Sequence, residues 1–465
     1  MPDAVAIAPT RSLALPESAM VELAGWGANA RVPCRLVTAD SPAELARRLD
    51  RRGTIARGLG RSYGDAATNR GGQVLGITGL DRYLGFDEAT ATLRCEAGVS
   101  LAQIIADFAP RGLFPMITPG TKYVTVGGCI ANDIHGKAHH AQGSFASCVD
   151  AITVLLASGD IVEASRTEHP DLFWGCFGGM GLLGVILTAT IRLRRIETCY
   201  FTQRAFVLPH LDAMLDALDE HDREFPYSVA TIDVVAHGAQ LGRGVLVVGD
   251  HATREQLPPG LRDDPLRVSG PPRVTVPFDL PQLSLNRVTV RAVNAVIQGM
   301  LRRTAPVGHY EGFFYPLDKI GHWNRGYGRR GFTQYQFVIP FERGREAMRR
   351  ILDTIIGAGQ LPFLNVLKRM GPASDGVLSF PAPGYTLAID FPIRDGTVEL
   401  LHRLDALVLD AGGRIYLGKD SFVQAEMFAR MVPAIERWRA IKRRYDPQGV
   451  FTSDLARRVG LVEPA

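Results

Sequence analysis

The stretch that decides the fold is ARGLGRSYGD, residues 56–65. It continues the strand-like TIAR (54–57) and places glycines at 58, 60 and 64, a GxGxxxG spacing. Small residues leave several backbone N–H groups exposed together, and such a concave nest binds pyrophosphate without a basic side chain. Ser62 adds a hydroxyl donor. One glycine turn is weak evidence by itself, so a nucleotide-binding loop here needs a second loop to support it.

The second loop is PGTKYVTVGGCIANDIHGKAHHAQGS, residues 119–144. It contains five glycines and three histidines, few long apolar residues, and no helical or strand period. A long segment without periodicity is typical of a functional loop. Because βαβ-like sequence separates the two loops, we expect one nucleotide cofactor to lie across both.

A third glycine motif, Gly179-Met-Gly181-Leu-Leu-Gly184, matches GxGxxG literally but stands in the wrong context. The dinucleotide fingerprint requires a strand before the glycines and a helix after them. Here DLFWGC precedes the glycines and the β-rich VILTATIRL follows them, so the order is reversed. We therefore interpret these glycines as permitting a tight start to a strand.

Composition excludes several classes of protein. The chain has 465 residues, 46% of them hydrophobic and 22% charged, which is enough for a large core. A net charge of +4, evenly spread, argues against nucleic acid as a partner. The chain shows no apolar run of membrane-spanning length and no secretory signal, so we expect a cytoplasmic protein whose only membrane contact is peripheral. Six scattered cysteines predict buried free thiols, and the absence of ligand spacing predicts no metal site.

The predicted fold class is α+β. Strands and helices alternate up to residue 199, and beyond it an antiparallel sheet covered by helices is expected. RIYLGKD (414–420) reads as a strand, and 421–449 reads as one long amphipathic helix. Together with the family resemblance described below, this pattern implies three parts, residues 1–199, 200–411 and 412–465. They are a cofactor-binding domain, a cap domain with a proline-rich mobile segment at 254–290, and a C-terminal segment that returns to the first domain.

Lysine is rare in this chain. There are six lysines among 52 basic residues, so each lysine marks a position where an amine replaces the usual guanidinium. An amine is compact, and burial can lower its pKa into the range of acid–base chemistry. Lys419 attracts most interest, although a lysine exposed on a strand is the simpler interpretation.

Several motifs together carry a family resemblance. The sequence resembles the FAD-linked oxidases of the vanillyl-alcohol oxidase type, with the PCMH-type fold, and more narrowly the decaprenylphosphoryl-β-D-ribose 2′-oxidases. The resemblance covers most of the chain from Gly25 to Leu461. It rests on these stretches: ARGLGRSYGD, PGTKYVTVGGCIANDIHGKAHH, LFWGCFGGMGLLGVI, HWNRGYG, QYQFVIP, FLNVLKRMGP, IDFPI, YLGKDS and YDPQGVFTSD.

The resemblance implies a PCMH-type FAD-binding domain of two α+β subdomains plus the cap. Matching motif positions implies FAD contacts from Arg57, Gly58, Leu59, Gly60, Arg61, Ser62, Tyr63, Gly64, Asp65, Gly120, Thr125, Val126, Gly127, Gly128, His135, Gly136, Lys137, Ile186 and Tyr416. It implies catalytic roles for Lys419, Tyr63 and His135. It implies a substrate pocket of Asn324, Gln334, Gln336, Asn365, Lys368 and Lys419, in which the polar groups have a structural role as the alternative.

Two details refine these expectations. Relatives with covalent flavin carry a histidine where this chain has Arg61, so we expect non-covalent FAD. The better-known members carry cysteine and asparagine where this chain has Ala388 and Thr386, and they differ also at Phe314, Val229 and Thr231. The resemblance therefore supports the identity of the cofactor more strongly than it supports a particular sugar or lipid.

The activity implied is FAD-dependent oxidation of the 2′-hydroxyl of a polyprenylphosphoryl ribose to the 2′-keto sugar. The implied partners are this lipid-linked sugar phosphate and an NAD(P)-dependent reductase that acts on the keto product. Lys419 would either stabilise negative charge on the reduced flavin or accept the hydroxyl proton. The alternatives are an oxidase of a soluble sugar, alditol or aldonolactone, a reductase that uses NADPH, and a nucleotide-binding module without redox function.

Overall fold

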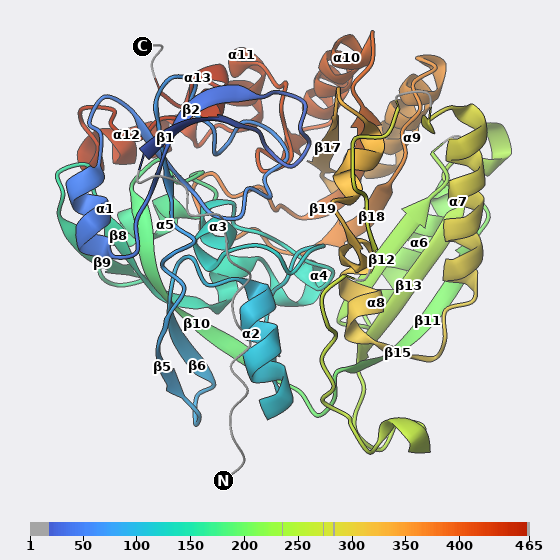
Figure 1. The fold of residues 1–465 in the computed structure, drawn as a ribbon. Helices are drawn as coiled ribbons and strands as arrows, with labels where there is room; N and C mark the ends of the chain where they lie inside the picture. The colour runs from blue at the N-terminus through green and yellow to red at the C-terminus, as the bar shows by residue number, and fades with distance from the viewer. Residues whose placement is uncertain (1–17, 235, 273, 282–283, 463–465) are drawn as a thin grey trace.

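The structure is a computed structural model that describes residues 18–462, apart from 235, 273, 282 and 283. Three large sheets and their helices divide the chain into a half that carries both glycine loops and a cap (Figure 1). The mixture of mostly antiparallel sheets and helices confirms the predicted α+β class. The part of the first predicted domain that spans residues 1–17 lies outside the described residues.

The first sheet has four strands in the order β1-β2-β4-β3. β2 and β3 both run parallel to β4, and α1 connects them. Ser41 begins this helix as its N-cap by accepting a bond from the N–H of Glu44. The elements are β1 (Ser18–Leu23), β2 (Val32–Thr38), α1 (Pro42–Arg48), β3 (Thr54–Arg57) and β4 (Gln73–Gly76).

The second sheet is antiparallel and is centred on β10, which pairs with β6, β7 and β8. The Gly179–Gly184 motif lies between α5 and β10, which agrees with the rejection of a dinucleotide fingerprint there. The elements are β5 (Tyr83–Asp87), β6 (Thr92–Glu96), α2 (Leu101–Phe108), β7 (Leu113–Pro115), α3 (Val126–Ala131), α4 (His139–Gln142), β8 (Val149–Leu155), β9 (Ile161–Ser165), α5 (Pro170–Cys176) and β10 (Val185–Arg195).

The cap is built on an eight-stranded antiparallel sheet in the order β15-β11-β13-β12-β18-β19-β17-β20. All nine residues of β19 are buried, because this strand lies inside the sheet and both of its faces are covered. The strands are β11 (Tyr200–Leu208), β12 (Tyr227–Ile232), β13 (Gly244–His251), β15 (Val307–His309), β17 (Phe332–Ile339), β18 (Asn365–Met370), β19 (Gly384–Pro392) and β20 (Arg414–Ile415).

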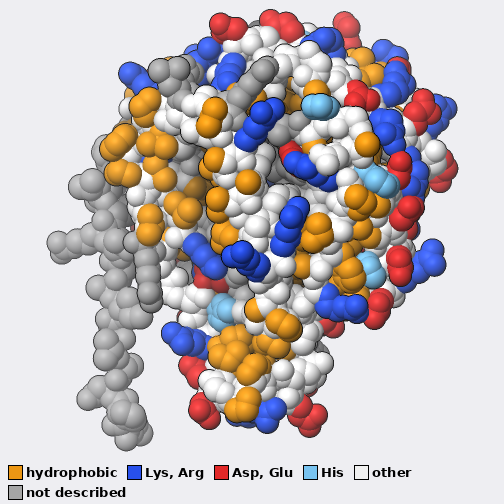
Figure 2. Space-filling view, turned by 90° about the vertical axis from the view of Figure 1, so that its right-hand side faces the viewer, with side chains coloured by type: hydrophobic (Ala, Val, Ile, Leu, Met, Phe, Trp, Pro, Cys, Tyr) orange, Lys and Arg blue, Asp and Glu red, His pale blue; other side chains and the backbone are white. Residues whose placement is uncertain are grey.

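Helices cover both faces of the cap sheet. α6 and α9 lie on one face and are joined by an ion pair of 2.7 Å between Asp212 and Arg349. α7 lies on the opposite face, which is toward the viewer in Figure 1 and on the side that faces the viewer in Figure 2. The cap helices are α6 (Leu211–His221), α7 (Arg287–Arg302), α8 (Tyr310–Phe314), α9 (Phe341–Gly357) and α10 (Thr397–Asp410). The six cysteines are all buried with free thiols.

The C-terminal segment packs back onto the first sheet. The N–H of Thr54 donates to the carbonyl of Val450 at 2.8 Å. Arg458 forms ion pairs with Asp65, at 2.7 Å, and with Asp420, at 2.8 Å. β20 still belongs to the cap sheet, so the chain leaves the cap after residue 415 rather than at the expected boundary of 411.

Three local expectations were wrong. The predicted helix over 421–449 is divided into α11 (Ala425–Met431) and α12 (Ile435–Tyr445), because Pro433 forces Val432 out of the helical region. The predicted strand 414–420 ends at Ile415, and Lys419 lies in the turn that follows. The loop 119–144 contains the short helices α3 and α4. Its glycines are poor helix formers and interrupt the spacing of apolar residues, so the sequence pattern does not reveal these helices.

The segment 254–290 contains little regular structure, as its composition indicates. Its described part includes β14 (Val274–Thr275), which pairs in parallel with β16 (Ile320–Gly321), and it ends in the first residues of α7. Residues 273, 282 and 283 lie outside the described residues. Its mobility stays a prediction.

Candidate active site

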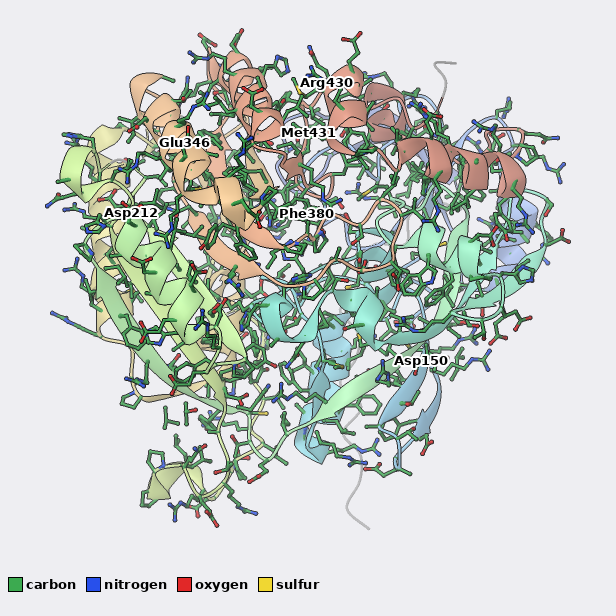
Figure 3. The ribbon with its side chains drawn as sticks, turned by 180° about the vertical axis from the view of Figure 1, so that it is seen from behind. Asp150, Asp212, Glu346, Phe380, Arg430 and Met431 are labelled. Carbon is green, nitrogen blue, oxygen red and sulfur yellow. The ribbon has the colours of Figure 1, made fainter. Side chains whose placement is uncertain are left out.

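A cavity of about 600 Å³ lies between the half with the glycine loops and the cap sheet. One wall comes from both glycine loops, and the opposite wall comes from β17, β18 and β19. Figure 3 shows the labelled Phe380 between these two halves, and its ring stacks on Tyr416, which lines the cavity, with 4.7 Å between centroids. This volume is typical of a cavity that binds a cofactor or small molecule.

The two glycine loops touch each other at the cavity wall. A Cβ atom on Gly58 would lie 2.2 Å from Oγ1 of Thr125, so glycine is required there for the loops to approach. Ser62 Oγ also lies 3.3 Å from Asn132 Oδ1. The structure therefore brings the two loops to one site, as the cofactor hypothesis requires.

Most of the residues assigned to the site from sequence line this cavity. Those that line it are Gly58, Leu59, Gly60, Arg61, Ser62, Tyr63, Gly120, Thr125, Gly127, Gly128, His135, Gly136, Lys137, Ile186, Gln334, Gln336, Lys368, Tyr416 and Lys419. Ala388 and Phe314, where the chain departs from the better-known members, line it as well. Their contacts with cofactor or substrate stay predictions.

Four predicted cofactor contacts lie outside the cavity lining: Arg57, Gly64, Asp65 and Val126. The guanidinium of Arg57 donates to the carbonyls of Ala24, at 2.7 Å, and Ala67, at 3.0 Å. Asp65 is paired with Arg458, and Val126 is fully buried in the core. These residues therefore shape the loops from behind rather than face the cavity.

Two predicted substrate residues are also placed elsewhere. Asn365 bonds the backbone of Ile232 through both ends of its amide, accepting at 2.9 Å and donating at 2.7 Å, and so joins β18 to β12. Asn324 donates to the carbonyl of Trp26 at 3.0 Å. For both side chains the structure shows the structural role that the sequence left as the alternative.

Lys419 presents its ammonium to the cavity. Its Nζ lies 3.9 Å from the centroid of the Tyr63 ring, and no hydrogen bond from this Nζ is found among the described residues. Burial lowers the pKa of Lys419 to about 8, while the carboxylate of Asp390 acts in the opposite direction. Tyr63 therefore serves as the platform on which this cation rests.

A chain of hydrogen bonds orients Gln336. Thr386 Oγ1 donates to the carbonyl of Phe337 at 2.7 Å, so its oxygen accepts from Gln336 Nε2 at 3.2 Å. The same amide nitrogen lies 3.1 Å from His135 Nε2 and donates to it. Nε2 of His135 is therefore an acceptor.

The orientation of Gln336 fixes the proton on His135. Burial lowers the pKa of His135 well below its usual value, so the ring is neutral and carries one N–H. That proton must be on Nδ1, which lies 3.2 Å from Lys368 Nζ. Lys368 accepts it as a neutral amine and donates to the carbonyl of Gly136 at 3.2 Å.

The neutral state of Lys368 agrees with its surroundings. Burial lowers its pKa to about 7, and the ammonium groups of Lys137 and Lys419 act in the same direction. Its side chain is 8% exposed and lines the cavity. The site thus holds one neutral amine, whose lone pair the N–H of His135 occupies, and one ammonium that keeps its own proton at neutral pH.

Lys137 lines the cavity, but its amine is hydrogen-bonded to the cap. Its Nζ donates to the backbone carbonyls of Phe313 and Phe314, the latter at 3.0 Å, at the end of α8. Burial lowers the pKa of Lys137 to about 7. Its amine therefore connects the second glycine loop to the cap, and only the rest of the residue is available to a cofactor.

Sequence reasoning missed the buried contacts that hold the second loop. Lys122 Nζ lies 2.7 Å from Glu311 Oε1, and the N–H of Lys122 donates to Asp318 Oδ2 at 2.9 Å. Asp133 accepts bonds from the hydroxyls of Ser144, at 2.9 Å, and Ser374, at 2.7 Å. No local pattern reveals these partners, because they lie up to 241 residues away in the chain.

Comparison with known proteins supports a redox site. An FAD binding domain family matches residues 35–165, and the D-arabinono-1,4-lactone oxidase family matches residues 329–459. Decaprenylphosphoryl-beta-D-ribose oxidase of Mycolicibacterium smegmatis is 41% identical over 451 residues, which cover 95% of this chain and 97% of that protein. The chain belongs to the decaprenylphosphoryl-beta-D-ribose oxidase family of FAD-linked oxidases.

More distant members of the wider group also match. L-gulono-1,4-lactone dehydrogenase of Mycobacterium tuberculosis is 25% identical over 448 residues, covering 92% of this chain and 96% of that protein. L-gulonolactone oxidase of Bos taurus is 30% identical over 183 residues, covering 39% of this chain and 40% of that protein. As a member of this oxidase family, the protein is an FAD-dependent oxidoreductase, which sets aside a module without redox function.

The residues present fit FAD. The two loops touch through Gly58 and Thr125, and beside this contact Gly120 lines the cavity with open space next to it, since a Cβ there would meet nothing within 4 Å. The ammonium of Lys419 faces the same cavity, where it complements a group that gains negative charge on reduction. The loops would hold the nucleotide, and Lys419 with Tyr416 would face the ring system.

Proposed function

We propose that the protein oxidises the 2′-hydroxyl of a polyprenylphosphoryl ribose to a ketone. The observation that carries this proposal is the pairing, in one cavity, of the neutral amine of Lys368 with the ammonium of Lys419. Oxidation of an alcohol requires removal of a proton from oxygen and a hydride from carbon. The identity of 41% to a relative named for this substrate supports the choice of sugar lipid.

The chain's own residues have distinct roles in this proposal. Lys368 accepts the hydroxyl proton after its single lone pair turns from the N–H of His135 to the substrate, while the carbonyl of Gly136 holds its amine in place. Lys419 remains an ammonium and stabilises negative charge in the cavity, with Tyr63 supporting it. FAD, when bound, supplies the acceptor for the hydride.

We propose further that FAD binds without a covalent bond. Arg61 occupies the position at which covalent relatives carry histidine, and its guanidinium lies 4.0 Å from the centroid of the Trp26 ring. A guanidinium does not form the flavin linkage. Denaturation followed by filtration should therefore release all of the yellow colour from the protein.

The keto product calls for a second reaction. An NAD(P)-dependent reductase that returns the keto group to an alcohol of opposite configuration would complete an epimerisation. The cap and the residues at the mouth of the cavity would admit a lipid-linked sugar phosphate. In the described part of the chain, the structure contains no helix that is both long and apolar enough to cross a membrane.

A second candidate function is oxidation of a soluble aldonolactone. The match of residues 329–459 to D-arabinono-1,4-lactone oxidase favours it, since this range includes Lys368 and Lys419. A third candidate function is that of a reductase that uses NADPH. All three differ in the compound that reduces the flavin.

The deciding experiment is anaerobic mixing with a short-chain probe, farnesylphosphoryl ribose, while the flavin absorbance is followed. We expect bleaching with this compound and none with its 2′-deoxy analogue, which lacks the reacting hydroxyl. Bleaching by D-arabinono-1,4-lactone in preference to the sugar lipid would support the second candidate. Bleaching by NADPH alone would support the third.

A further inference from the structure

Helix α7 carries apolar side chains on its outward side as well as on the side that packs against the cap sheet. Its outward stripe is apolar: Val288 is 77% exposed, Val296 is 61% exposed and Met300 is 69% exposed. The side toward the cap sheet buries Val290 and packs Leu301 against the core, and Gln298 donates from it to the carbonyl of Thr231 at 3.2 Å. A helix on a water-exposed surface ordinarily places its apolar residues inward. The outward stripe therefore calls for an apolar partner.

The apolar stripe is one part of a larger surface. Among the described residues, thirteen large hydrophobic side chains are exposed, and seven of them lie within the short stretch from 274 to 320. We call these seven the α7 surface: Val274, Phe278, Val288, Val293, Val296, Met300 and Ile320. Clusters of exposed apolar side chains of this kind mark interaction sites.

The α7 surface adjoins the mouth of the active-site cavity. Val274 and Ile320 are paired in the small sheet of β14 and β16, and the next residue, Gly321, lines the cavity. Arg325 connects the segment after β14 to the mouth of the cavity, because its guanidinium donates to the carbonyl of Pro277 at 2.7 Å. A ligand could therefore pass between the cavity and whatever covers this surface.

The charge of the chain is less evenly spread than its composition led us to expect, because one segment is strongly basic. Residues 265–330 contain ten Lys or Arg and three Asp or Glu, an excess larger than the net charge of +4 of the whole chain. Two of the three acids, Glu311 and Asp318, are buried. Figure 2 shows the consequence: hydrophobic and basic side chains fill the left and centre of this face, whereas acidic ones lie toward its rim. The partner is therefore apolar and anionic.

We propose that the α7 surface docks on an anionic lipid bilayer, with α7 lying in the plane of the interface. Aliphatic side chains flanked by arginine are the pattern of an interfacial amphipathic helix. The choice of a membrane over a protein partner rests on the basic excess of this segment, which complements anionic lipid, and on the proposed function, because a prenyl tail would have to leave a bilayer to enter the cavity.

Vesicle sedimentation tests this proposal without any substrate. The FAD-loaded protein should sediment with phosphatidylcholine vesicles that contain phosphatidylglycerol, and binding should weaken with added salt. The double variant V296E/M300E should lower the partition constant at least about tenfold, because it removes apolar burial and adds repulsion. Its circular dichroism, flavin content and turnover of detergent-dispersed farnesylphosphoryl ribose should equal those of the parent.

Ile161→Glu is the matched control. Ile161 is 50% exposed on β9, in the half of the molecule that carries the glycine loops, so this charge should leave vesicle binding unchanged. Failure of the parent to bind, or equal binding by V296E/M300E, would overturn the proposal. A change of sedimentation coefficient in V296E/M300E without any change in vesicle binding would show that the surface joins protein chains instead. If the parent binds vesicles but does not turn over farnesylphosphoryl ribose, the proposed function is wrong and the proposed membrane contact stands.

Discussion

Lys122 and Glu311 form a buried ion pair, with 2.7 Å between Nζ and Oε1, that joins the second glycine loop to helix α8 of the cap. Their side chains are 6% and 9% exposed. A buried charge left without its partner destabilises a fold far more than an exposed one. This pair therefore couples the integrity of the cofactor loop to the position of the cap.

Replacement of one partner should destabilise the protein more than replacement of both. We expect Glu311→Met to lower the free energy of unfolding by roughly 3 kcal/mol, because Lys122 would remain charged and unpaired. The double variant K122M/E311M should recover most of this loss. Urea denaturation of the three proteins, with flavin fluorescence as the signal, measures both effects. Equal losses in the single and double variants would contradict the coupling.

The pH dependence of turnover should be bell-shaped. Lys368 acts as the neutral amine, so kcat/KM should rise as the pH increases past about 7, the pKa to which burial lowers this group. Lys419 acts as the ammonium, so activity should fall as the pH increases past about 8. Because Lys368 and Lys419 interact, the two apparent pKa values of this profile belong to the pair rather than to either residue alone. Lys368→Met should remove the acidic limb along with most of the activity, whereas a flat profile in the parent would contradict both roles.

Lys419 should tolerate arginine better than a neutral residue. We expect Lys419→Met to bind FAD and to turn over about 10²- to 10³-fold more slowly, because the stabilising charge is lost. Lys419→Arg keeps the charge, so its basic limb should move to higher pH. Stopped-flow flavin reduction separates this step from substrate binding. Similar rates in the methionine variant and the parent would exclude Lys419 from the reaction.

The orientation of Gln336 depends on Thr386. Thr386→Val removes the hydroxyl that accepts from Gln336 Nε2 at 3.2 Å and keeps the shape of the side chain. The amide can then turn, which allows the proton of His135 to move to Nε2, and flavin reduction should slow about tenfold or more. Thr153→Val, which breaks a bond of 2.7 Å to Thr188 in the second sheet, is the control and should have no effect on the rate.

The contact between the two glycine loops gives a test with a rescue. Gly58→Ala should weaken FAD binding at least about tenfold, because the new methyl group would overlap Oγ1 of Thr125. G58A/T125A removes the overlap and should regain part of the affinity. Gly85→Ala, whose methyl group would meet nothing within 4 Å, is the control for glycine replacement itself. Full flavin content in Gly58→Ala would show that the loops do not hold the cofactor.

Glycine spacing and strand context were enough to predict that residues 56–65 and 119–144 meet at one site. A side chain at position 58 would overlap that of Thr125, and the glycine that avoids this overlap is visible in the sequence itself. The sequence resemblance brought Lys419, Lys368 and His135 to the site, but it did not show that Lys419 lies in a turn after β20. Periodicity gives strands and helices, whereas a turn of this kind depends on what packs around it.

Contacts between distant residues were beyond sequence reasoning. Nothing in the sequence distinguishes Glu311 and Asp318 from exposed acidic residues. Only the fold buries them against Lys122. Asn365 was expected in the substrate pocket because polar residues there are plausible, yet its amide matches the backbone of Ile232. The division of the tail at Pro433 was readable in principle, since proline interrupts a helix.

The route of the chain through the site has a consequence for biosynthesis. Lys419 comes from the segment after the cap, and Arg458 binds both Asp65 and Asp420. A nascent chain that has emerged only to the end of the cap has both glycine loops but lacks the cation, the arginine and the strand pairing at Thr54 that complete them. Flavin should therefore be captured after release from the ribosome rather than during synthesis, and a prematurely terminated product should accumulate as a colourless polypeptide.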